Sequence, residues 1–558
     1  MAKYDNFSRE ELIELLEKQD KELARKKYGL VWDSEKEPEQ VVLDCTKKLP
    51  ILKNITEKDI KTNDDDYNIM IEGDNYHALQ VLNYTHKGKV DVIYIDPPYN
   101  TGNKEGQFVY NDKFVDKEDG YRHSKWLNFM EKRLELAKNL LTEQGLIFIS
   151  IDDNEQANLK LLCNKIFGES NFINQFIWKR NSSGKTEKNK FTVNSEYLLL
   201  YSNTNSYHLN DAYKPLADAT RALYKLDDND GRGKYRLYPL QKPAAPGPET
   251  TYDYVDNTGK VWKCPAKGWR IKYSKLKELE NDNRLCLTNK TLSEKAYWNE
   301  RDSDGKRIDT LWNDLPENSF ASKELTEVIG KNAIFNNPKP TKLIARCLDI
   351  VDKNALVLDF FAGSGTTGQA VLDLNKQDGG NRRFIICTNN EGNIASEVCY
   401  PRIQKVIQGY NKNGNEEFIE GLGGNLKYFK TDFVVNSKNK TQTKINLAKQ
   451  CSEMLCLKTG IYNLLDEENP CFKLFDNNKH NKFLCVYFDF FGNNIQEFIH
   501  KIKTLNGEKF VFMFSLDENV DRSLFEGIEN IKIEPIPQKI LDVYKKIAKE
   551  HIKGDNHD

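Results

Sequence analysis

The chain has 558 residues and a mass of 64.7 kDa, so we expect roughly three or four domains. With 39% hydrophobic and 30% charged residues and a net charge of −2, its composition excludes a disordered or collagen-like protein. No segment approaches the ~18 consecutive apolar residues of a membrane span, and the first residues carry no apolar signal region. We therefore expect a cytoplasmic protein without a membrane partner.

The first 177 residues predict a helical segment followed by α/β structure. A capping-box pattern, Ser8 with Glu11, opens an apolar helix, and we expect residues 1–50 to form a helical N-terminal segment. From 51 to 177, strand and helix patterns then alternate. The expected strands are 68–74, 90–95 and 145–151, and the expected helices are 75–84 and 124–141.

The segment 178–330 loses this alternation and is rich in turn residues, with PAAPGP at 243–248. Between Trp178 and Glu300 it contains 22 Lys and Arg against 15 Asp and Glu, a net charge of +7, and 16 aromatic residues. Lys and Arg displace counterions from phosphates, while aromatic rings stack on bases. This composition fits a nucleic-acid surface, and it equally fits a solvated basic face on an ordinary domain.

Alternation resumes at 331–430, and the block 431–558 is predicted to be a separate α+β domain. The expected helices of the first block are 342–350, 366–374 and 401–409, and its strands are 355–361 and 382–388. The last block has strand candidates at 483–491 and 509–516 and a final helix at 539–550. Strands that alternate with helices imply a doubly wound, mostly parallel, Rossmann-like sheet, which the basic insert splits in sequence.

The cysteines and histidines give no sign of a metal site. The 11 cysteines have irregular spacing without a C-x-x-C pair, and the 8 histidines are scattered. We expect reduced, mostly buried thiols and no metal ion.

A glycine-rich motif follows the apolar strand that ends near Phe360. Its residues Gly363, Gly365 and Gly368 have the spacing G-x-G-x-x-G and open a helix, so a nucleotide or nucleoside can approach the backbone closely. Glu391 lies 23 residues after Gly368, near the usual position of a ribose-binding carboxylate. The motif alone does not separate a nicotinamide cofactor from S-adenosylmethionine.

A second motif, Asp96-Pro97-Pro98-Tyr99, stands at the carboxyl end of the apolar strand 90–95, where doubly wound sheets place active sites. The exocyclic amine of a base is a weak nucleophile, because its lone pair is delocalised into the ring. An Asp96 carboxylate and a Pro97 carbonyl could accept its two hydrogens, and Tyr99 offers a ring on which a flipped base can stack. We therefore interpret the motif as a site for group transfer to such an amine.

These motifs resemble those of amino-methylating DNA methyltransferases of the β group, and specifically the modification subunits of type III restriction–modification systems. The order of DPPY, basic insert and FAGSG is that of the group. Further similar segments are EGDN at 72–75, NNPKPTKLI at 336–344, GLIFISIDDNEQANLKLLCNKIFGESNF at 145–172 and PIPQKILDVYKKI at 535–547. The resemblance is weakest across about 180–320.

The resemblance implies roles for individual residues. Asp96, Pro97, Pro98 and Tyr99 would form the catalytic motif. The S-adenosylmethionine site would comprise Asp74, Lys339, Pro340, Asp359, Phe361, Ala362, Gly363, Ser364, Gly365, Thr366, Thr367 and Glu391. Many relatives carry an acid at the end of the strand after the glycine-rich loop, where this chain has Thr388 or Asn389, so Glu391 is the substitute.

The resemblance also implies a domain plan and partners. The halves 51–177 and 331–430 would form the methyltransferase domain, 178–330 the target recognition domain, and 431–558 a dimerisation or partner domain. It implies double-stranded DNA, a second copy of the chain and a separate restriction subunit as partners. The sequence has no Walker A pattern, so we expect the ATP-driven translocase to be that separate subunit rather than this chain.

Three alternatives remain beside an adenine-specific enzyme. Methylation of the cytosine exocyclic amine has the same geometry, although Asp96 favours adenine because that branch of the family more often has Ser there. A nicotinamide-dependent oxidoreductase could use the same glycines, and a DNA-binding subunit without activity could retain the fold.

Overall fold

The structure is a computed structural model that describes residues 39–552 with short gaps. The gaps are 103–107, 112, 184–188, 190, 212, 215–217, 243–246, 289–290, 302–305, 332–334, 413–416, 467–468 and 517–518. Two compact units make up the chain: one combines the residues up to Asn210 with those from Thr310 onward, and the other spans Asp211–Asp309. Most of the helix predicted within 1–50 lies outside the described residues.

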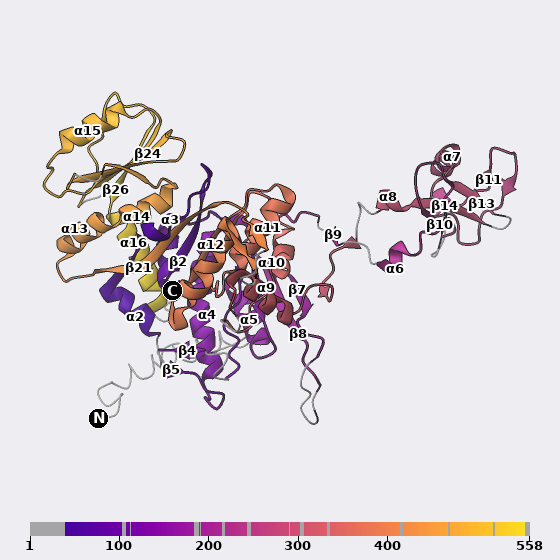
Figure 1. Cartoon of the computed structure of the whole chain (residues 1–558), viewed down its shortest axis with the longest axis horizontal. Helices are drawn as coiled ribbons and strands as arrows, with labels where there is room; N and C mark the ends of the chain where they lie inside the picture. Colours follow the sequence, from indigo (N-terminus) through magenta and orange to yellow (C-terminus); the bar gives the residue numbers. More distant parts are fainter. Residues whose placement is uncertain are drawn as a thin grey trace, which may run out of the picture. The chain divides into compact units, whose positions relative to one another are not determined.

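A ten-stranded sheet forms the centre of the larger unit (Figure 1). The strands from β21 through β6 run parallel, whereas β1 and β8 join antiparallel to their inner neighbours. This confirms the predicted mostly parallel α/β sheet. In spatial order the strands are β1 (Lys48–Asn54), β21 (Asn425–Val435), β2 (Tyr67–Glu72), β18 (Arg383–Thr388), β17 (Leu356–Asp359), β3 (Val90–Ile95), β6 (Leu141–Ile151), β8 (Ser195–Ser202), β7 (Phe172–Lys179) and β16 (Leu311–Trp312).

Helices cover both faces of this sheet. On one face α3 (Asn75–Thr85), α4 (Arg122–Leu140) and α5 (Gln156–Phe167) pack side by side. A second group, seen together in Figure 1, contains α9 (Asn318–Ile329), α10 (Thr341–Leu348), α11 (Thr366–Asp378) and α12 (Tyr400–Gln408). Strands buried on both faces explain why the motif strands are continuous apolar runs rather than alternating patterns.

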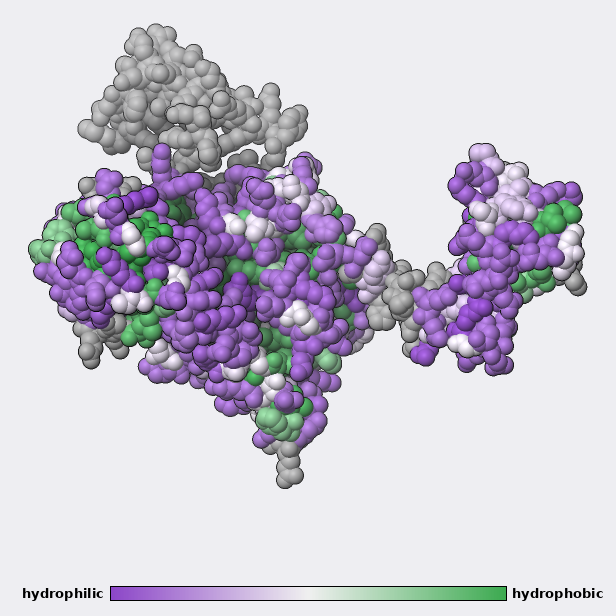
Figure 2. Space-filling view, turned by 90° about the horizontal axis from the view of Figure 1, so that it is seen from above, coloured by the Kyte–Doolittle hydropathy of each residue, from purple (hydrophilic) through white to green (hydrophobic). Residues whose placement is uncertain are grey.

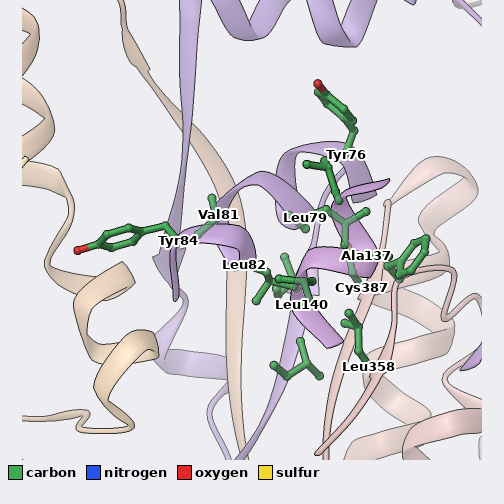
Figure 3. Close-up of a cluster of buried hydrophobic side chains, with 14 of the residues drawn as sticks. Tyr76, Leu79, Val81, Leu82, Tyr84, Ala137, Leu140, Leu358 and Cys387 are labelled. Carbon is green, nitrogen blue, oxygen red and sulfur yellow. The ribbon is translucent and has the colours of Figure 1, made fainter. Parts of the chain in front are cut away.

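The apolar core under the first helix layer joins residues from both halves of the sequence. Figure 3 shows α3 side chains such as Leu79 and Leu82 beside Leu140 of α4, with Leu358 of β17 and Cys387 of β18 from the second half. All five are less than 1% exposed. Because β18 and β17 lie between β2 and β3, neither half of the sequence can complete the sheet alone.

The boundaries predicted for the insert at 178 and 330 differ from the structure. Strands β7 and β8 and the short β16 belong to the large sheet, and the separate unit is only Asp211–Asp309. The reason is the apolar run in β8, where Leu198, Leu199 and Leu200 are buried against the sheet's helices and strands. Strand β8 pairs antiparallel with β6, the last parallel strand. The prediction was based on strands that alternate with helices, and such a strand does not fit that pattern.

The unit Asp211–Asp309 has a small core of its own. A three-stranded sheet orders β10 (Tyr235–Pro239), β14 (Leu292–Tyr297) and β13 (Leu285–Leu287), with α7 (Tyr273–Asn281) and the pair β11 (Tyr254–Val255) and β12 (Val261–Trp262). Its further short elements are β9 (Tyr213–Lys214), α6 (Asp218–Arg221), α8 (Trp298–Arg301) and β15 (Lys306–Arg307).

Most rings of this unit are interior residues rather than parts of an exposed base-stacking surface. Tyr254, Trp262, Trp269 and Leu276 pack in one cluster, and Tyr297 is 1% exposed. Several cations lie over these rings instead, as Lys260 does over Trp262 at 3.9 Å from the ring centroid.

The C-terminal block is attached to the central sheet rather than separate from residue 431. Strand β21 crosses the predicted boundary, and α14 (Ser452–Thr459) and α16 (Gln538–Ile552) pack on α3. Beyond them a mixed five-stranded sheet, with α13 (Lys440–Gln450) before it and α15 (Ile495–Thr504) within it, has its own core. Its strands are β22 (Asn463–Asp466), β23 (Phe472–Asp476), β24 (Lys482–Tyr487), β25 (Glu508–Phe514) and β26 (Ile531–Ile536).

The N-terminal prediction is partly wrong. After α2 (Gln40–Lys47) the chain forms β1, an edge strand of the large sheet, although residues 1–50 were expected to be helical. The apolar run in KLPILKN is buried against the sheet's core, and a proline near its start is compatible with an edge strand.

The surface and the cysteines agree with a globular protein. Figure 2 shows a mostly hydrophilic face with hydrophobic residues in separate patches. Nine of the 11 cysteines are buried, as predicted. Among the described residues, no helix combines the length and apolarity that a membrane crossing requires.

The interleaved core predicts a stability effect. Leu358→Ala should lower the free energy of unfolding by about 3 kcal/mol, because it leaves a cavity between β17 and the α3–α4 layer. Urea unfolding followed by circular dichroism measures this loss. Leu161→Ala, at a 46% exposed position on α5, is the matched control and should change stability by less than about 0.5 kcal/mol. Equal effects of the two substitutions would contradict the packing.

Candidate active site

The catalytic motif begins where β3 ends. Asp96 follows Ile95 directly, and the indole nitrogen of Trp126 on α4 donates to the Pro98 carbonyl oxygen at 2.7 Å. Asn100, with φ 54°, is buried and turns the chain away from the sheet. The proline pair is thereby fixed at both sides, and the Asp96 side chain is held at the carboxyl edge of the sheet.

Asp96 belongs to a partly buried network of two carboxylates and two cations. The Lys339 ammonium lies 3.0 Å from Asp96 Oδ2 and 3.3 Å from Glu196 Oε2. Glu196 stands at the start of β8, and its other oxygen Oε1 accepts from Arg180 at 2.8 Å. The Tyr99 hydroxyl donates to Glu196 Oε2 at 3.2 Å, and Lys339 lies over the Tyr99 ring at 4.9 Å.

The protonation states follow from these contacts. Burial raises the pKa of Asp96, which Lys339 opposes and Glu196 reinforces. For Glu196 burial acts in the same direction, but Lys339 and Arg180 outweigh it and hold the pKa of that carboxyl below its usual value. Burial would lower the pKa of Lys339, yet the two carboxylates raise it.

One oxygen of Asp96 has no partner in the network. Asp96 Oδ1 is buried without a hydrogen-bond partner among the described residues. An unsatisfied buried acceptor costs free energy unless a ligand supplies a donor. The site therefore offers an acceptor for an N–H or O–H group of a bound molecule.

The glycine-rich loop begins at the end of β17, the strand next to β3. Gly363 and Gly365 have φ of 49° and 79°, in the left-handed region that favours glycine. A Cβ on Gly363 would lie 3.0 Å from the Phe335 ring, and one on Gly365 would lie 3.1 Å from Cys399 Sγ. Gly368 serves packing instead, since its Cβ would lie 2.5 Å from Ile403 on α12.

The hydroxyl groups of the loop form hydrogen bonds with other side chains of the protein. Buried Arg402 on α12 donates to Ser364 Oγ at 3.2 Å and to Thr366 Oγ1 at 2.8 Å. Thr367 donates to Asp359 Oδ2 at 2.5 Å, and the Phe361 N–H donates to Asp359 Oδ1 at 2.9 Å. These contacts fix the loop's shape. The Ala362 N–H, which donates to the Cys387 carbonyl oxygen, joins the loop to β18.

Asp359, at the end of β17, is a buried acid with a perturbed pKa. Burial raises its pKa to about 7, and Asp96 adds to this through its charge, while the bonds from Thr367 and Phe361 act against it. Near neutral pH the carboxyl is therefore partly protonated. A cationic ligand group beside Asp359 would favour its ionised form.

Asp74 caps the start of α3 at the same edge. Its Oδ1 accepts from the Tyr76 N–H at 2.7 Å and lies 3.7 Å from Arg133. The buried guanidinium of Arg133 also holds Asn75 Oδ1 at 2.6 Å and both oxygens of Glu39. Asn75 in turn donates to the Phe360 carbonyl oxygen at 3.1 Å, which ties this corner to the glycine-rich loop.

The remaining predicted residues lie around the same edge. Pro340 precedes α10 and is buried beside Lys339. Glu391 is exposed in the turn after β18, whose last residue Thr388 is buried. In the described part of the chain, no group of three or more His, Cys, Asp or Glu residues could hold a metal ion.

Three acids stand at one edge of the sheet. Asp74 comes shortly after β2, Asp359 ends β17 and Asp96 directly follows β3, and these strands are parallel in the order β2, β18, β17, β3. Acids at this edge can receive an ammonium or ribose hydroxyls, and glycines with positive φ permit a close backbone approach.

A family model described as a DNA methylase matches residues 90–399, more than half of the chain. The chain belongs to the N6/N4 DNA methylase family. Members of this family use S-adenosylmethionine as cofactor. The match covers β3 and the glycine-rich loop as well as the unit Asp211–Asp309 between them.

Three relatives extend this assignment. The Mod subunit of the type III restriction-modification enzyme StyLTI from Salmonella typhimurium is 33% identical over 64% of this chain and 58% of its own length. The type II methyltransferase M.KpnI from Klebsiella pneumoniae is 34% identical over 59% and 82%, respectively. The EcoPI Mod subunit from Escherichia phage P1 is 31% identical over 69% and 67%. The chain thus spans little more than half of the StyLTI subunit, and it is a homologue of Mod subunits.

Sequence reasoning missed Glu196, Arg180 and Arg133. Glu196 and Arg180 fell inside the range assigned to the insert, so an acid at the start of an apolar strand was not connected with Asp96. The signal that could have found Glu196 is its position before LLL in a strand-like run. Arg133 lies on the buried face of α4, where a charged residue requires a partner.

The raised pKa of Asp359 predicts pH-dependent cofactor binding by this N6/N4 family member. The affinity for S-adenosylmethionine should rise as pH increases through about 7, because the ionised carboxylate attracts the ligand's ammonium. Isothermal titration calorimetry between about pH 6 and pH 8 measures this rise. Asp359→Asn should bind more weakly with a flat profile over this range. A rise of the same size in Asp359→Asn would contradict the assignment.

Proposed function

We propose that this chain methylates the exocyclic N6 amine of adenine at specific sites in double-stranded DNA. The observation that carries the proposal is the buried Oδ1 of Asp96, an acceptor without a partner directly after β3. Asp96 directly precedes Pro97 in a motif whose tyrosine hydroxyl donates to Glu196.

The chemistry at this site is positioning and charge stabilisation. S-adenosylmethionine supplies a methyl group on a positively charged sulfur. Asp96 and the Pro97 carbonyl oxygen accept the two hydrogens of the target amine, which directs its lone pair toward that methyl group. As the amine nitrogen gains positive charge, both acceptors stabilise it, and one amine proton leaves through Asp96 Oδ1. Tyr99, held through its hydroxyl by Glu196, stacks on the flipped base.

Two features favour adenine over the cytosine amine. The motif begins with an aspartate, whereas serine is commoner at this position in the cytosine-directed branch. Two of the relatives described above are Mod subunits of type III enzymes, and the proposal takes their restriction-modification context as a guide. Glu391 remains our proposed ribose ligand because it follows β18 at the site's edge and is exposed.

We further propose that the unit Asp211–Asp309 reads the DNA sequence. It carries 20 Lys and Arg against 16 Asp and Glu, a net charge of +4, whereas the range Trp178 to Glu300 has a net charge of +7. With most rings in its core, its contact to DNA depends mainly on cations and polar groups at the surface. Figure 2 shows this unit, at the right, as mainly hydrophilic.

The similarity to Mod subunits also suggests protein partners. We propose a homodimer, with the C-terminal block as its interface or as the docking site of a separate restriction subunit. The sequence lacks a Walker A pattern, and we propose that the restriction subunit would carry the ATP-driven translocase. The cytoplasm is the compartment in which such an enzyme meets its DNA.

The proposal is tested by expressing the chain in a methylation-deficient bacterial host. Single-molecule sequencing of genomic DNA should find N6-methyladenine in one sequence context for the wild type and none for Asp96→Ala. Leu161→Ala, on an exposed face of α5, is the control and should leave the pattern unchanged. Modified adenine in the Asp96→Ala strain, or modified cytosine in the wild type, would refute the assignment.

The recognition unit can be tested by excision. The chain enters and leaves it at anchored points, since the Asn210 N–H donates to Ile350 and the Ile177 N–H donates to Thr310, each at 2.8 Å. Replacing residues 211–309 by a short Gly-Ser linker should therefore preserve S-adenosylmethionine binding but abolish site-specific methylation. Retained modification of the original site, measured by sequencing, would show that recognition lies elsewhere.

A further inference from the structure

We infer that Glu196 is a positioning residue for methyl transfer: it shares the Lys339 ammonium with Asp96, so that Lys339 keeps a carboxylate partner when the target amine binds Asp96. This inference rests on the proposed function and deepens it. It concerns a residue outside the DPPY and FAGSG motifs, on a strand that precedes the recognition unit.

The geometry shows that one ammonium serves both carboxylates. Lys339 Nζ lies 3.0 Å from Asp96 Oδ2 and 3.3 Å from Glu196 Oε2. The Lys339 side chain is 6% exposed and that of Glu196 is 3% exposed, so water does not readily replace either partner. Asp96, directly after β3, and Glu196, at the start of β8, thus bind the same cation.

The two carboxylates differ in how completely they are bound. Glu196 is satisfied at both oxygens, by Arg180 at Oε1 and by Lys339 and Tyr99 at Oε2. Asp96 has Lys339 at Oδ2 and nothing at Oδ1. Glu196 is therefore the fixed end of the network, and Asp96 is the end that remains open to a ligand.

Binding of an amine to Asp96 has a consequence for Lys339. The amine would donate to Asp96 Oδ1 while Lys339 lies at Oδ2, so both draw on the charge of one carboxylate. As the amine nitrogen gains positive charge during transfer, it weakens the attraction between Asp96 and Lys339. With Glu196 present, Lys339 can move away from Asp96 Oδ2 and keep a carboxylate partner. Without the Glu196 charge, a displaced Lys339 would be a buried cation with no counterion, which is strongly unfavourable. Glu196 thereby lowers the free-energy cost of admitting the amine.

Other charged groups near this network are few in the described residues. Arg180 contacts Glu196, Asp152 interacts with Glu196 and Arg180 through its charge, and Asp359 and Asp96 raise each other's energy when both are ionised. The phenols of Tyr94 and Tyr99 stand beside Asp96 and are held neutral by burial. Of the neighbours of Asp96, Glu196 is the acid that also binds its counterion.

The first test is steady-state methylation of a duplex containing the site, with Glu196→Gln. The value of kcat at neutral pH should fall about 10- to 100-fold, because Lys339 then binds Asp96 alone and resists displacement. The KM for S-adenosylmethionine should stay within about twofold, since Glu196 lies on the catalytic side. The acid limb of the pH–rate profile should move to lower pH, because Asp96 loses a neighbouring negative charge.

Companion variants separate positioning from a structural role. Glu196→Asp retains the charge and should keep the wild-type acid limb with a smaller loss of kcat, which also serves if Glu196→Gln folds poorly. In a Lys339→Met background, Glu196→Gln should cost far less than in the wild type, because there is no ammonium left to share. Glu534→Gln, which removes an acid paired with Lys458 at 3.0 Å in the C-terminal block, is the matched control.

Clear outcomes would overturn the inference. A Glu196→Gln enzyme with wild-type kcat and acid limb, or one slowed equally at every pH, would show that Glu196 does not control access to Asp96. Additive effects of Glu196→Gln and Lys339→Met would do the same. If the wild type itself fails to methylate DNA, the proposed function fails, and this is distinguishable because the wild type is measured first.

Discussion

The shared ammonium of Lys339 is the interaction on which the active site depends. It joins the end of β3, the start of β8 and the segment before α10, three parts of the chain that are distant in sequence. Removing two carboxylates and a lysine from water is costly, and only close pairing offsets that cost. The folded sheet is what provides this pairing, so catalytic geometry and correct assembly of the two sequence halves are coupled.

The interleaved strand order explains how two remote motifs become one site. Because β17 lies directly beside β3, the glycine-rich loop and the DPPY motif emerge at the same edge. Their buried acids have different tasks set by different surroundings. Asp96 keeps a cation and an open oxygen, whereas Asp359 has only neutral donors and titrates near neutral pH. In the proposed mechanism, these two environments adapt one residue type to an amine acceptor and to a cofactor contact.

The sequence predicted those parts of the fold that repeat a local pattern. Strands β2, β3, β17 and β18 are near-continuous apolar runs with helices between them, so their type and order along the chain were readable. Their spatial order was not, since it depends on which strands pair. Strands β1 and β8 were missed because an antiparallel edge strand and an antiparallel return strand break the alternation on which the prediction was based.

The site shows the same division. Asp96 and the glycines lie in motifs of distinct spacing and could be selected from the sequence alone. Lys339 came from the family resemblance as a cofactor residue, and its contact with Asp96 was not predicted. Glu196 and Arg180 matter only through the residues they contact in space, which no spacing reveals. The aromatic residues of the insert were left open for a related reason: composition records that rings and cations are interleaved, but only burial decides that Tyr254 and Trp269 form a core.

The most direct measurement of the central claim is the chemical identity of the methylated base. Purified chain, duplex DNA containing the site and methyl-labelled S-adenosylmethionine would be incubated together, and the DNA digested to nucleosides for mass spectrometry. The account predicts that the label appears in N6-methyladenine alone. Label in a methylated cytosine, or DNA without label while the protein binds the cofactor, would contradict it.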